Sequence, residues 1–423
     1  MKRIFFLAII LFTVFTSYSQ EVDRNEVERI LKTLASDEMQ GRAVFTPGIE
    51  KAASFISEEF KKAGIQPYKD GSYQQVFYLK RANFISASGK VNGREITDRG
   101  ILAFSLKPDL SVNQNSGYEH AVVKKEDNLI RKFQELLGQQ KNMVIFVDSA
   151  HSSMFNGLRR ALANRDRTEY DLVFLLNNGE ATQYNVNYKQ EIKDLELKNI
   201  VGVLPGKSKP EEYVIFSAHY DHLGIGRPDK EQDSIFNGAN DNASGVTAVI
   251  SLAKYFNERG GNERTLIFAA FTAEESGGHG SKYFSQQYAP EKVMAMFNIE
   301  MIGTESKWGK NSAFITGYEK TDMGEILSKA LENSHFKFLP DPYPQQNLFY
   351  RSDNATLARL GVPAHTISTS KMDVEPYYHT AQDEFETLDV DNMTEIIKAI
   401  ALSSFSIIEG KATPSRVDSS QLR

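Results

Sequence analysis

The sequence contains no cysteine among its 423 residues. This absence excludes a thiolate nucleophile, a structural zinc site built from cysteines, and disulfide bonds. It also removes the residue to which a lipoprotein attaches its lipid. Stability must therefore come from a hydrophobic core, and a chain of this length is long enough to bury a large one.

The sequence has no apolar segment long enough to cross a membrane. The apolar stretch from Ile4 to Phe15 is shorter than the roughly 20 residues that a bilayer-spanning helix needs. It follows Lys2 and Arg3 and precedes the small residues of Ser17-Tyr-Ser19, as in a secretory signal peptide. We therefore predict a signal peptide over residues 1–19 and an exported protein, periplasmic or secreted. A buried N-terminal helix would be the competing interpretation.

Clustered positive charge is also missing. The formal net charge is −6 and becomes about −8 once residues 1–19, which carry two basic and no acidic side chains, are removed. Nucleic acids and anionic membranes attract proteins with basic patches. Neither is expected as a partner, and the sequence does not indicate the oligomeric state.

The stretch from Ile215 to Gly245 gathers the first polar residues of a candidate site. A short apolar run ends in His219-Tyr-Asp221, and side chains that alternate with period two place this histidine and aspartate on one face of a strand. The aspartate can then orient the imidazole, as metal-binding histidines require. Asp241 follows after a loop, in N-D-N-A-S-G.

Further carboxylates and a histidine follow other predicted strands. The run from Thr265 to Phe271 is continuously apolar, as in a strand buried on both faces, and Glu274 and Glu275 come just after it. Glu300 ends A-M-F-N-I-E, and His379 lies in Y-Y-H-T. Because ligands of open α/β sheets gather outside the carboxyl ends of strands, these residues are predicted to form one site.

These residue types suit hydrolysis assisted by metal ions. Two metal ions about 3.5–4 Å apart can polarise a carbonyl group and acidify water. Nitrogen and oxygen ligands from histidine and carboxylates suit zinc, although cobalt or manganese can also bind such a set.

Five motifs carry a resemblance to a known family. H-Y-D, N-D-N-A-S-G, E-E-S-G-x-x-G-S, N-I-E-M-I-G and Y-H-T-A-Q-D occur in this order. Together they resemble the di-zinc exopeptidases of the bacterial leucyl aminopeptidase and aminopeptidase Y type, over about residues 22–78 and 199–409. The resemblance implies a three-layer α/β/α fold with a mostly parallel, mixed central sheet.

The resemblance also assigns ligands to two Zn²⁺ ions. One ion would be held by His219 and Glu300, the other by Glu275 and His379, and Asp241 would bridge them. Many family members have aspartate where this chain has Glu300, which is one methylene longer. The geometry between the metals and the binding of a substrate amine are therefore expected to differ.

Other roles follow from the same resemblance. Glu274 would be the general base that takes a proton from the water between the metals, and Tyr378 would face the developing oxyanion. Asp221 would support His219 without binding metal itself. A cis peptide bond is implied between Asp241 and Asn242. Asn354 replaces a histidine common in the family and is expected to change the shape of the pocket.

The domain organisation is predicted from where the motifs occur. Residues 20–83 and 197–412 would form a discontinuous zinc peptidase domain. Residues 84–196 would form an α+β insert domain, at the position where related enzymes often carry a protease-associated domain. The insert would either shape access to the site or only stabilise the protein. Residues 413–423 are expected to be a polar, frayed tail.

Helices are predicted in the peptidase domain from apolar periodicity. Two lie between Asn25 and Gly64, with Gly64 as the C-cap, and one runs from Ser244 to Phe256, capped by Ser244 or Asn242. A closing helix is expected over residues 389–405.

The predicted function is that of a zinc-dependent aminopeptidase that removes N-terminal residues from peptides. A carboxypeptidase or dipeptidase on the same scaffold would need a basic residue for a free carboxylate, and Arg351 is the candidate. A glutaminyl cyclase and a non-catalytic binding ectodomain are two further functions that this fold could support.

Several residues near the motifs have no role assigned by the resemblance. His222 and His279 are expected at the surface or behind the ligands, with His222 the better candidate for an additional ligand. The aromatic residues that could line a substrate pocket are Tyr343, Phe349, Tyr350 and Tyr377.

Overall fold

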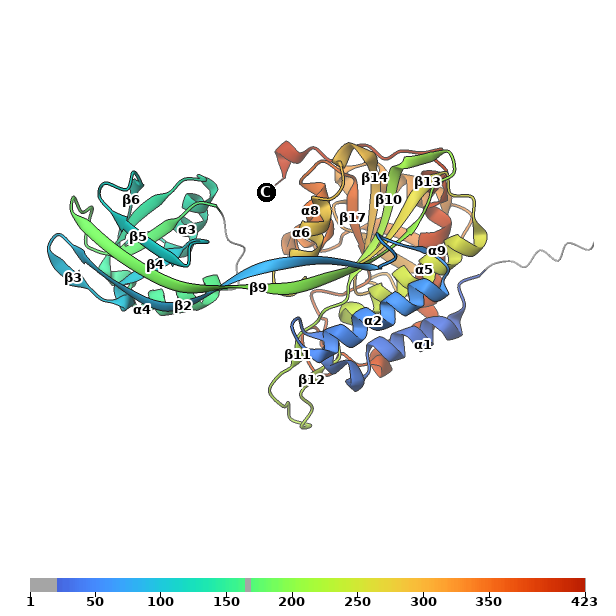
Figure 1. Cartoon of the computed structure of the whole chain (residues 1–423). Coiled ribbons are helices and arrows are strands. Elements are labelled where there is room, and N and C mark those ends of the chain that lie inside the picture. Colours follow the sequence, from blue (N-terminus) through green and yellow to red (C-terminus); the bar gives the residue numbers. More distant parts are fainter. Residues whose placement is uncertain (1–20, 164–168, 423) are drawn as a thin grey trace, which may run out of the picture. The chain divides into compact units, whose positions relative to one another are not determined.

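A computed structural model describes residues 21–163 and 169–422, so the predicted signal peptide lies outside the described residues. The chain divides into two compact units, and residues 76–197 form the smaller one. The chain enters the smaller unit along β2 (Gln74–Val91) and leaves it along β9 (Tyr184–Leu204) (Figure 1). The sequence places the start of the insert later, at residue 84, because no motif marks where β2 begins.

The larger unit is built on a mixed sheet. Its strands lie in the order β16 (Lys337–Pro340), β15 (Ser312–Ile315), β17 (Ala364–Ser368), β14 (Val293–Ile299), β10 (Lys209–His219), β13 (Arg264–Phe271) and β9, which also pairs with β1 (Gln66–Pro67). β10 is parallel to β13 and β14, and β14 is parallel to β17. β9 and β15 run antiparallel to their neighbours β13 and β17. The mostly parallel, mixed sheet is confirmed.

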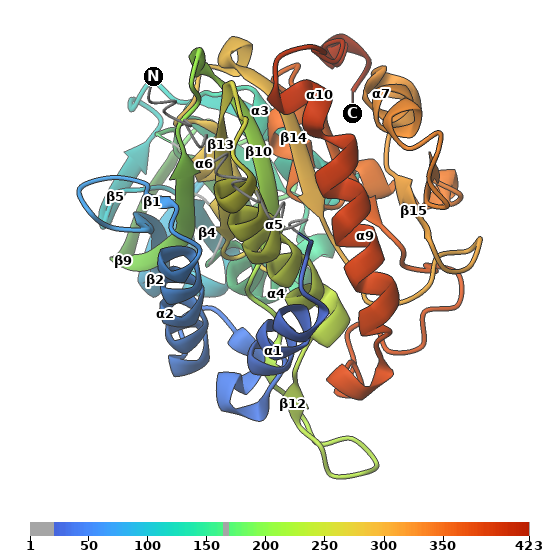
Figure 2. The ribbon, with the colours of Figure 1, turned by 90° about the vertical axis from the view of Figure 1, so that its right-hand side faces the viewer.

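Helices cover both faces of this sheet. On one face lie α1 (Arg24–Leu34), α2 (Pro47–Lys62), α5 (Gly245–Arg259) and α9 (Val390–Ser403), as Figure 2 shows. On the other lie α6 (His279–Ser285) and α8 (Asn354–Ala358). The alternation of β10 explains the layers: Val214 and Phe216 pack into one hydrophobic core, and Ile215 into another. The predicted three-layer α/β/α fold is confirmed.

Local signals in the sequence explain two helix ends. Gly64 has a φ of +73° and donates its N–H to the Lys61 carbonyl at 3.0 Å, which closes the last turn of α2. At the start of α5, the side chain of Asn242 accepts the N–H of Gly245 at 3.0 Å. Ser244 instead donates its hydroxyl to the Asn240 carbonyl. Asn242 is therefore the side chain that caps α5.

Among its described residues, the smaller unit contains a four-stranded sheet and two α-helices. The strands are β4 (Ile101–Phe104), β8 (Leu172–Leu176), β7 (Met143–Val147) and β6 (Glu119–Val123), in that order, and the helices are α3 (Leu129–Gly138) and α4 (Ser152–Ala163). β3 (Arg94–Ile96) pairs with β2, and β5 (Asp109–Asn113) pairs with β9. The stretch between residues 141 and 176 contributes β7, α4 and β8.

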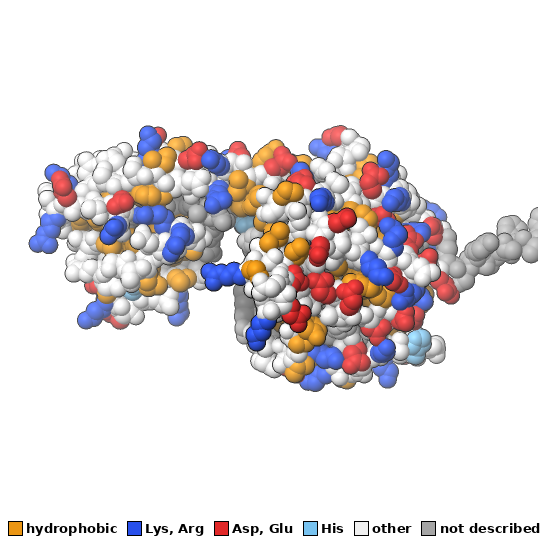
Figure 3. All heavy atoms as spheres, turned by 90° about the horizontal axis from the view of Figure 1, so that it is seen from below, with side chains coloured by type: hydrophobic (Ala, Val, Ile, Leu, Met, Phe, Trp, Pro, Cys, Tyr) orange, Lys and Arg blue, Asp and Glu red, His pale blue; other side chains and the backbone are white. Residues whose placement is uncertain are grey.

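The remaining strands and α-helices of the described residues belong to the larger unit. They are β11 (Gly224–Ile225), β12 (Ile235–Phe236), α7 (Met323–Ala330) and α10 (Phe405–Ile408). No helix among the described residues is both long and apolar enough to span a bilayer. On the face drawn in Figure 3, basic and acidic side chains are interspersed, with acidic ones densest over the larger unit.

The C-terminal segment is not frayed, so that expectation is wrong up to residue 422. Arg416 donates to the carbonyls of Val293 and Pro290, and Val417 is buried. Arg264 donates to the carbonyl of Ala412 and to the hydroxyl of Thr413. The prediction rested on the polar composition of the segment. Its polar groups form hydrogen bonds with the rest of the larger unit, so the segment is ordered.

Candidate active site and metal centre

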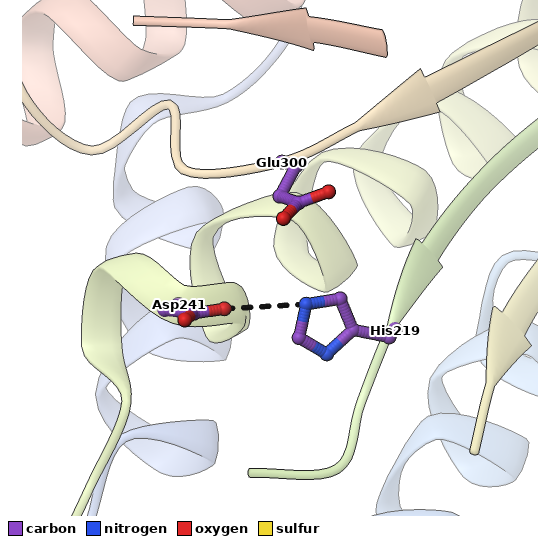
Figure 4. Close-up of side chains that lie close together, drawn as sticks. All are labelled: His219, Asp241 and Glu300. Carbon is purple, nitrogen blue, oxygen red and sulfur yellow. Dashed lines mark ion pairs between the residues drawn. The ribbon is translucent and has the colours of Figure 1, made fainter. Parts of the chain in front are cut away.

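The first group of candidate ligands lies at the ends of two neighbouring strands. His219 is the last residue of β10, and Glu300 follows the last residue of β14. Together with Asp241 they offer one nitrogen and two carboxylate oxygens that lie within 4.8 Å of one another (Figure 4). The imidazole Nε2 of His219 is 3.2 Å from Oδ1 of Asp241. Three of the predicted ligands therefore come together here.

The second group shares Asp241 with the first. His222, Asp241 and Glu275 again offer ligand atoms within 4.8 Å of one another. Nε2 of His379 lies 3.3 Å from Oδ2 of Asp241 and 3.2 Å from Oε1 of Glu275. Asp241 thus directs one carboxylate oxygen to His219 and the other to His379. A carboxylate in this position could bridge two metal ions.

The site contains buried polar atoms that the protein itself leaves unsatisfied. Nε2 of His219, of His222 and of His379, and Oδ1 of Asp241, form no hydrogen bond. A buried polar atom without a partner costs about 1–3 kcal/mol. Divalent cations among these nitrogen and oxygen donors would satisfy all four atoms, and the donor types suit zinc. The residues present therefore fit a metal centre.

His222 lies closer to the candidate ligands than the sequence indicates. It is 2% exposed, and its Nδ1 lies 3.0 Å from Oε1 of Glu275. Its Nε2 is the unsatisfied atom. Of the two positions expected for His222, at the surface or behind the ligands, the structure shows the buried one, and its status as the better candidate for an additional ligand agrees with this geometry.

Asp221 supports the site differently from the predicted way. Nδ1 of His219 lies 3.1 Å from the main-chain carbonyl of Asp221, while the nearer carboxylate oxygen of Asp221 is 3.9 Å away. The carboxylate instead accepts the N–H groups of Glu274 at 3.0 Å and Glu275 at 3.3 Å. The period-two argument fails because β10 ends at His219. Asp221 therefore positions the loop of the two glutamates.

Glu274 lies next to this cluster but belongs to neither ligand group. Burial raises the pKa of Glu274 well above its usual range, and the neighbouring Glu300 adds to the effect, while His219 opposes it. A carboxyl group beside candidate ligands, and outside their set, can take up and release a proton during a reaction.

The peptide bond between Asp241 and Asn242 is cis, as predicted. The side-chain amide of Asn242 donates to the Ile299 carbonyl at 3.0 Å and accepts the N–H of Met301 at 3.2 Å. These residues flank Glu300. Asn242 therefore links the backbone of one candidate ligand to that of another.

Two cavities adjoin the candidate ligands. The first, about 50 Å³, is lined by Glu300 and Tyr378, by the apolar side chains of Met301, Phe314, Leu348 and Met372, and by polar side chains that include Thr316, Thr366, Ser368 and Ser370. The ring of Tyr378 stacks on that of His379 with centroids 3.9 Å apart. The second, about 470 Å³, is lined by Glu274 and Arg351 among others.

The predicted aromatic lining is largely wrong. Of the four aromatic residues proposed for a pocket, Tyr350 alone lines either cavity, and Tyr343 and Phe349 are buried in packing contacts. No signal in the sequence distinguishes the four apolar residues of the first cavity. Asn354 is fully buried and accepts the Thr366 hydroxyl at 2.9 Å, so it acts behind the cavity wall.

Fold and site together define a class: an α/β protein with a candidate two-metal centre at the carboxyl edge of its sheet. The model of Peptidase family M28 matches residues 199–403, which include all the candidate ligands. This match confirms the resemblance that the sequence motifs indicate.

Curated relatives support the same assignment. The chain is 30% identical over 210 residues to a protein named "Probable leucine aminopeptidase" from Trichophyton verrucosum, covering 47% of this chain and 54% of that protein. A protein of the same name from Arthroderma benhamiae is 29% identical, with the same coverage. The chain thus spans about half the length of the curated relatives it matches.

Solved structures share the fold at low sequence identity. An aminopeptidase from Aneurinibacillus sp. strain AM-1 has a TM-score of 0.55 at 17% identity, covering 91% of this chain and 94% of that chain. BSAP, a zinc aminopeptidase from Bacillus subtilis, has a TM-score of 0.55 at 16% identity, covering 95% and 99%. A glutaminyl cyclase from Bacteroides thetaiotaomicron has a TM-score of 0.50 at 14% identity, covering 91% and 98%. The fold alone therefore does not decide between these activities.

Proposed function

We propose that the protein is a zinc-dependent aminopeptidase that hydrolyses the first peptide bond of peptides with a free N-terminus. One observation carries the proposal: two groups of candidate ligands share Asp241 and lie beside Glu274, which belongs to neither group. The similarity to leucine aminopeptidases over 210 residues supports it.

Two zinc ions are proposed, one at His219, Asp241 and Glu300, and one at Asp241, Glu275 and His379, with His222 as a further donor. When bound, they would polarise the scissile carbonyl and lower the pKa of water. Glu274 takes a proton from the attacking water and delivers it to the leaving amine. Tyr378, which lines the first cavity, is proposed to donate its hydroxyl to the developing oxyanion.

The first cavity is proposed to receive the side chain of the N-terminal residue. Its four apolar side chains favour an apolar residue, and its small volume of about 50 Å³ favours one of moderate size. The protein is proposed to be exported, periplasmic or secreted, on the basis of residues 1–19.

Glutaminyl cyclase and a binding ectodomain are the weaker candidates. A cyclase normally works with one zinc ion, whereas the two overlapping groups of candidate ligands favour two. A non-catalytic binding ectodomain would not need a general base such as Glu274. A carboxypeptidase has one observation in its favour, since Arg351 lines both cavities and could bind a free carboxylate.

The test is a pool of peptides, free or acetylated at the amino end, incubated with the protein with and without a chelator. Mass spectrometry should detect stepwise loss of residues from free N-termini only, stopped by the chelator and restored by zinc. Trimming of acetylated peptides from the carboxyl end would instead establish a carboxypeptidase. Conversion of N-terminal glutamine to pyroglutamate would identify a cyclase.

The variant Glu274→Gln separates an enzyme from a binding protein. It should retain zinc, measured by elemental analysis, and lose peptide hydrolysis by at least about a hundredfold. Unchanged hydrolysis with zinc retained would overturn the mechanism.

A further inference from the structure

The larger cavity beside Glu274 has positive charge in its lining. It measures about 470 Å³ and is lined by Arg351, Arg359 and Lys282 as well as by Glu274 and Ser352. Arg351 and Arg359 flank the short helix α8. Asp353, which also lines the cavity, is 2% exposed, whereas both arginines are exposed.

The two arginines differ from the arginines that are held by ion pairs within the described part of the chain. Arg29 and Arg264 form ion pairs with Glu59 and Glu212. Neither Arg351 nor Arg359 forms an ion pair with any described residue. A guanidinium group presents donors in a planar fork that matches a carboxylate. Their free donors, in the wall of one cavity, therefore suit an external carboxylate.

The position of the cavity indicates which carboxylate this is. Arg351 and Ser352 line both cavities, and the hydroxyl of Ser352 donates to Glu300. Both cavities therefore border Ser352, which contacts a candidate ligand. If the N-terminal side chain occupies the first cavity, the leaving part of the peptide extends into the second. In a dipeptide, the leaving part ends in a free α-carboxylate only one residue beyond the scissile bond.

We propose that Arg351 and Arg359 bind the free α-carboxylate of the leaving residue, which makes short peptides, dipeptides above all, the preferred substrates. This inference rests on the proposed aminopeptidase function. Longer peptides would carry their carboxylate beyond the cavity and lose this interaction.

The test compares Leu-Ala with its C-terminal amide. Wild-type protein should hydrolyse the free acid with a kcat/KM about twofold to fivefold higher, the range expected for an ion pair with exposed arginines. Arg351→Gln and Arg359→Gln should bring this ratio towards one, mainly through KM, and Arg359→Lys should keep part of it. Arg131→Gln, an exposed arginine of α3, should leave the ratio unchanged.

An equal kcat/KM for acid and amide in the wild type, or a ratio unchanged in both glutamine variants, would overturn the inference. Calorimetric binding of the same two dipeptides to zinc-loaded Glu274→Gln separates this result from the proposed function. Tighter, arginine-dependent binding of the free acid without any hydrolysis by the wild type would keep the carboxylate site and reject the aminopeptidase. Hydrolysis with equal binding of acid and amide would do the reverse.

Discussion

The carboxylate of Asp383 accepts the main-chain N–H of Asp241 at 2.9 Å through Oδ2, and that of Asn240 at 2.8 Å through Oδ1. Asp383 is 2% exposed and follows His379 in the same loop. This loop therefore supplies an imidazole to the site and also fixes the backbone of the residue that both ligand groups share.

Asp383→Asn should weaken the site. Asparagine keeps one acceptor oxygen and turns an NH₂ group towards an N–H donor, which leaves buried donors unsatisfied. We expect a loss of about 1–3 kcal/mol in the free energy of unfolding and zinc affinity about tenfold lower or more. Urea unfolding of zinc-free protein and a calorimetric zinc titration measure the two effects. Asp391→Asn, whose side chain is 79% exposed, is the control, and wild-type zinc affinity in Asp383→Asn would contradict the prediction.

Arg42 ties together the segments on either side of the site. It is fully buried, and its guanidinium donates to the carbonyls of Tyr220 at 2.9 Å, Asn237 at 2.6 Å and Gly238 at 2.9 Å, and to that of Leu34 at 2.6 Å. Three of these carbonyls belong to the segments that carry candidate ligands.

Arg42→Lys should destabilise the protein despite conserving the charge. An ammonium group has three donors at one point and cannot reach four carbonyls that a planar fork contacts. We expect the free energy of unfolding to fall by about 2 kcal/mol or more. Urea unfolding measures it, with Arg131→Lys as the exposed control. Equal stability of the two variants would show that the planar fork is not required.

The ion pairs of Glu59, which lies away from the candidate site, predict that the stability of the protein depends on pH. Its side chain is 2% exposed and forms ion pairs with Arg29 at 2.5 Å and Lys62 at 2.8 Å. Burial opposes its ionisation, but the hydrogen bonds from both cations outweigh burial and lower the pKa of Glu59. Folding therefore favours the ionised form. Its contribution is complete above the pKa of an unfolded glutamate, about 4.3, and is lost as the pH falls through the lower folded value.

Glu59→Gln should accordingly be destabilised at pH 7, with a smaller difference from the wild type at pH 3. Urea unfolding at both values measures the difference, and Glu58→Gln, whose side chain is 62% exposed, is the control. A destabilisation that is equal at both pH values would mean that packing, and not charge, accounts for the role of Glu59.

Two of the five predicted ligands could be predicted from strand ends, whereas Asp241, Glu275 and His379 lie in turns or irregular segments and are assigned through the family motifs. His219 and Glu300 end apolar runs, and parallel strands bring such ends to one edge of a sheet. Asp221 and His222 lie just beyond β10, where alternation no longer applies, so their contacts could not be read from the period of the strand.

Contacts with main-chain atoms were not accessible from the sequence. Arg42 and Asp383 form hydrogen bonds with carbonyl and N–H groups of residues far away along the chain. Because almost every residue has these main-chain groups, the residue types do not reveal such contacts. The packing of Arg416 and Val417 was missed for a similar reason, since a polar composition resembles that of a free end. The four apolar residues of the first cavity come from separate loops and strands, and only the fold brings them together.

The role of His222 in the metal centre can be tested directly, and the sequence did not fully predict it. Its Nδ1 lies 3.0 Å from Glu275, and its Nε2 has no hydrogen bond. It can therefore either bind metal itself or only hold Glu275 in place. Loss of a ligand or of such a supporting contact lowers metal affinity by roughly 10–100-fold, so His222→Ala should bind the second zinc ion more weakly in either case.

His222→Asn separates the two roles, because an amide can still donate to Glu275 but replaces the imidazole donor. We expect both His222→Ala and His222→Asn to keep about one zinc ion per chain after dialysis, where the wild type keeps two. Elemental analysis measures the ratio, with His335→Ala, whose side chain is 70% exposed, as the control. Two ions in His222→Asn and one in His222→Ala would assign His222 to positioning Glu275, and two ions in both variants would remove it from the metal centre.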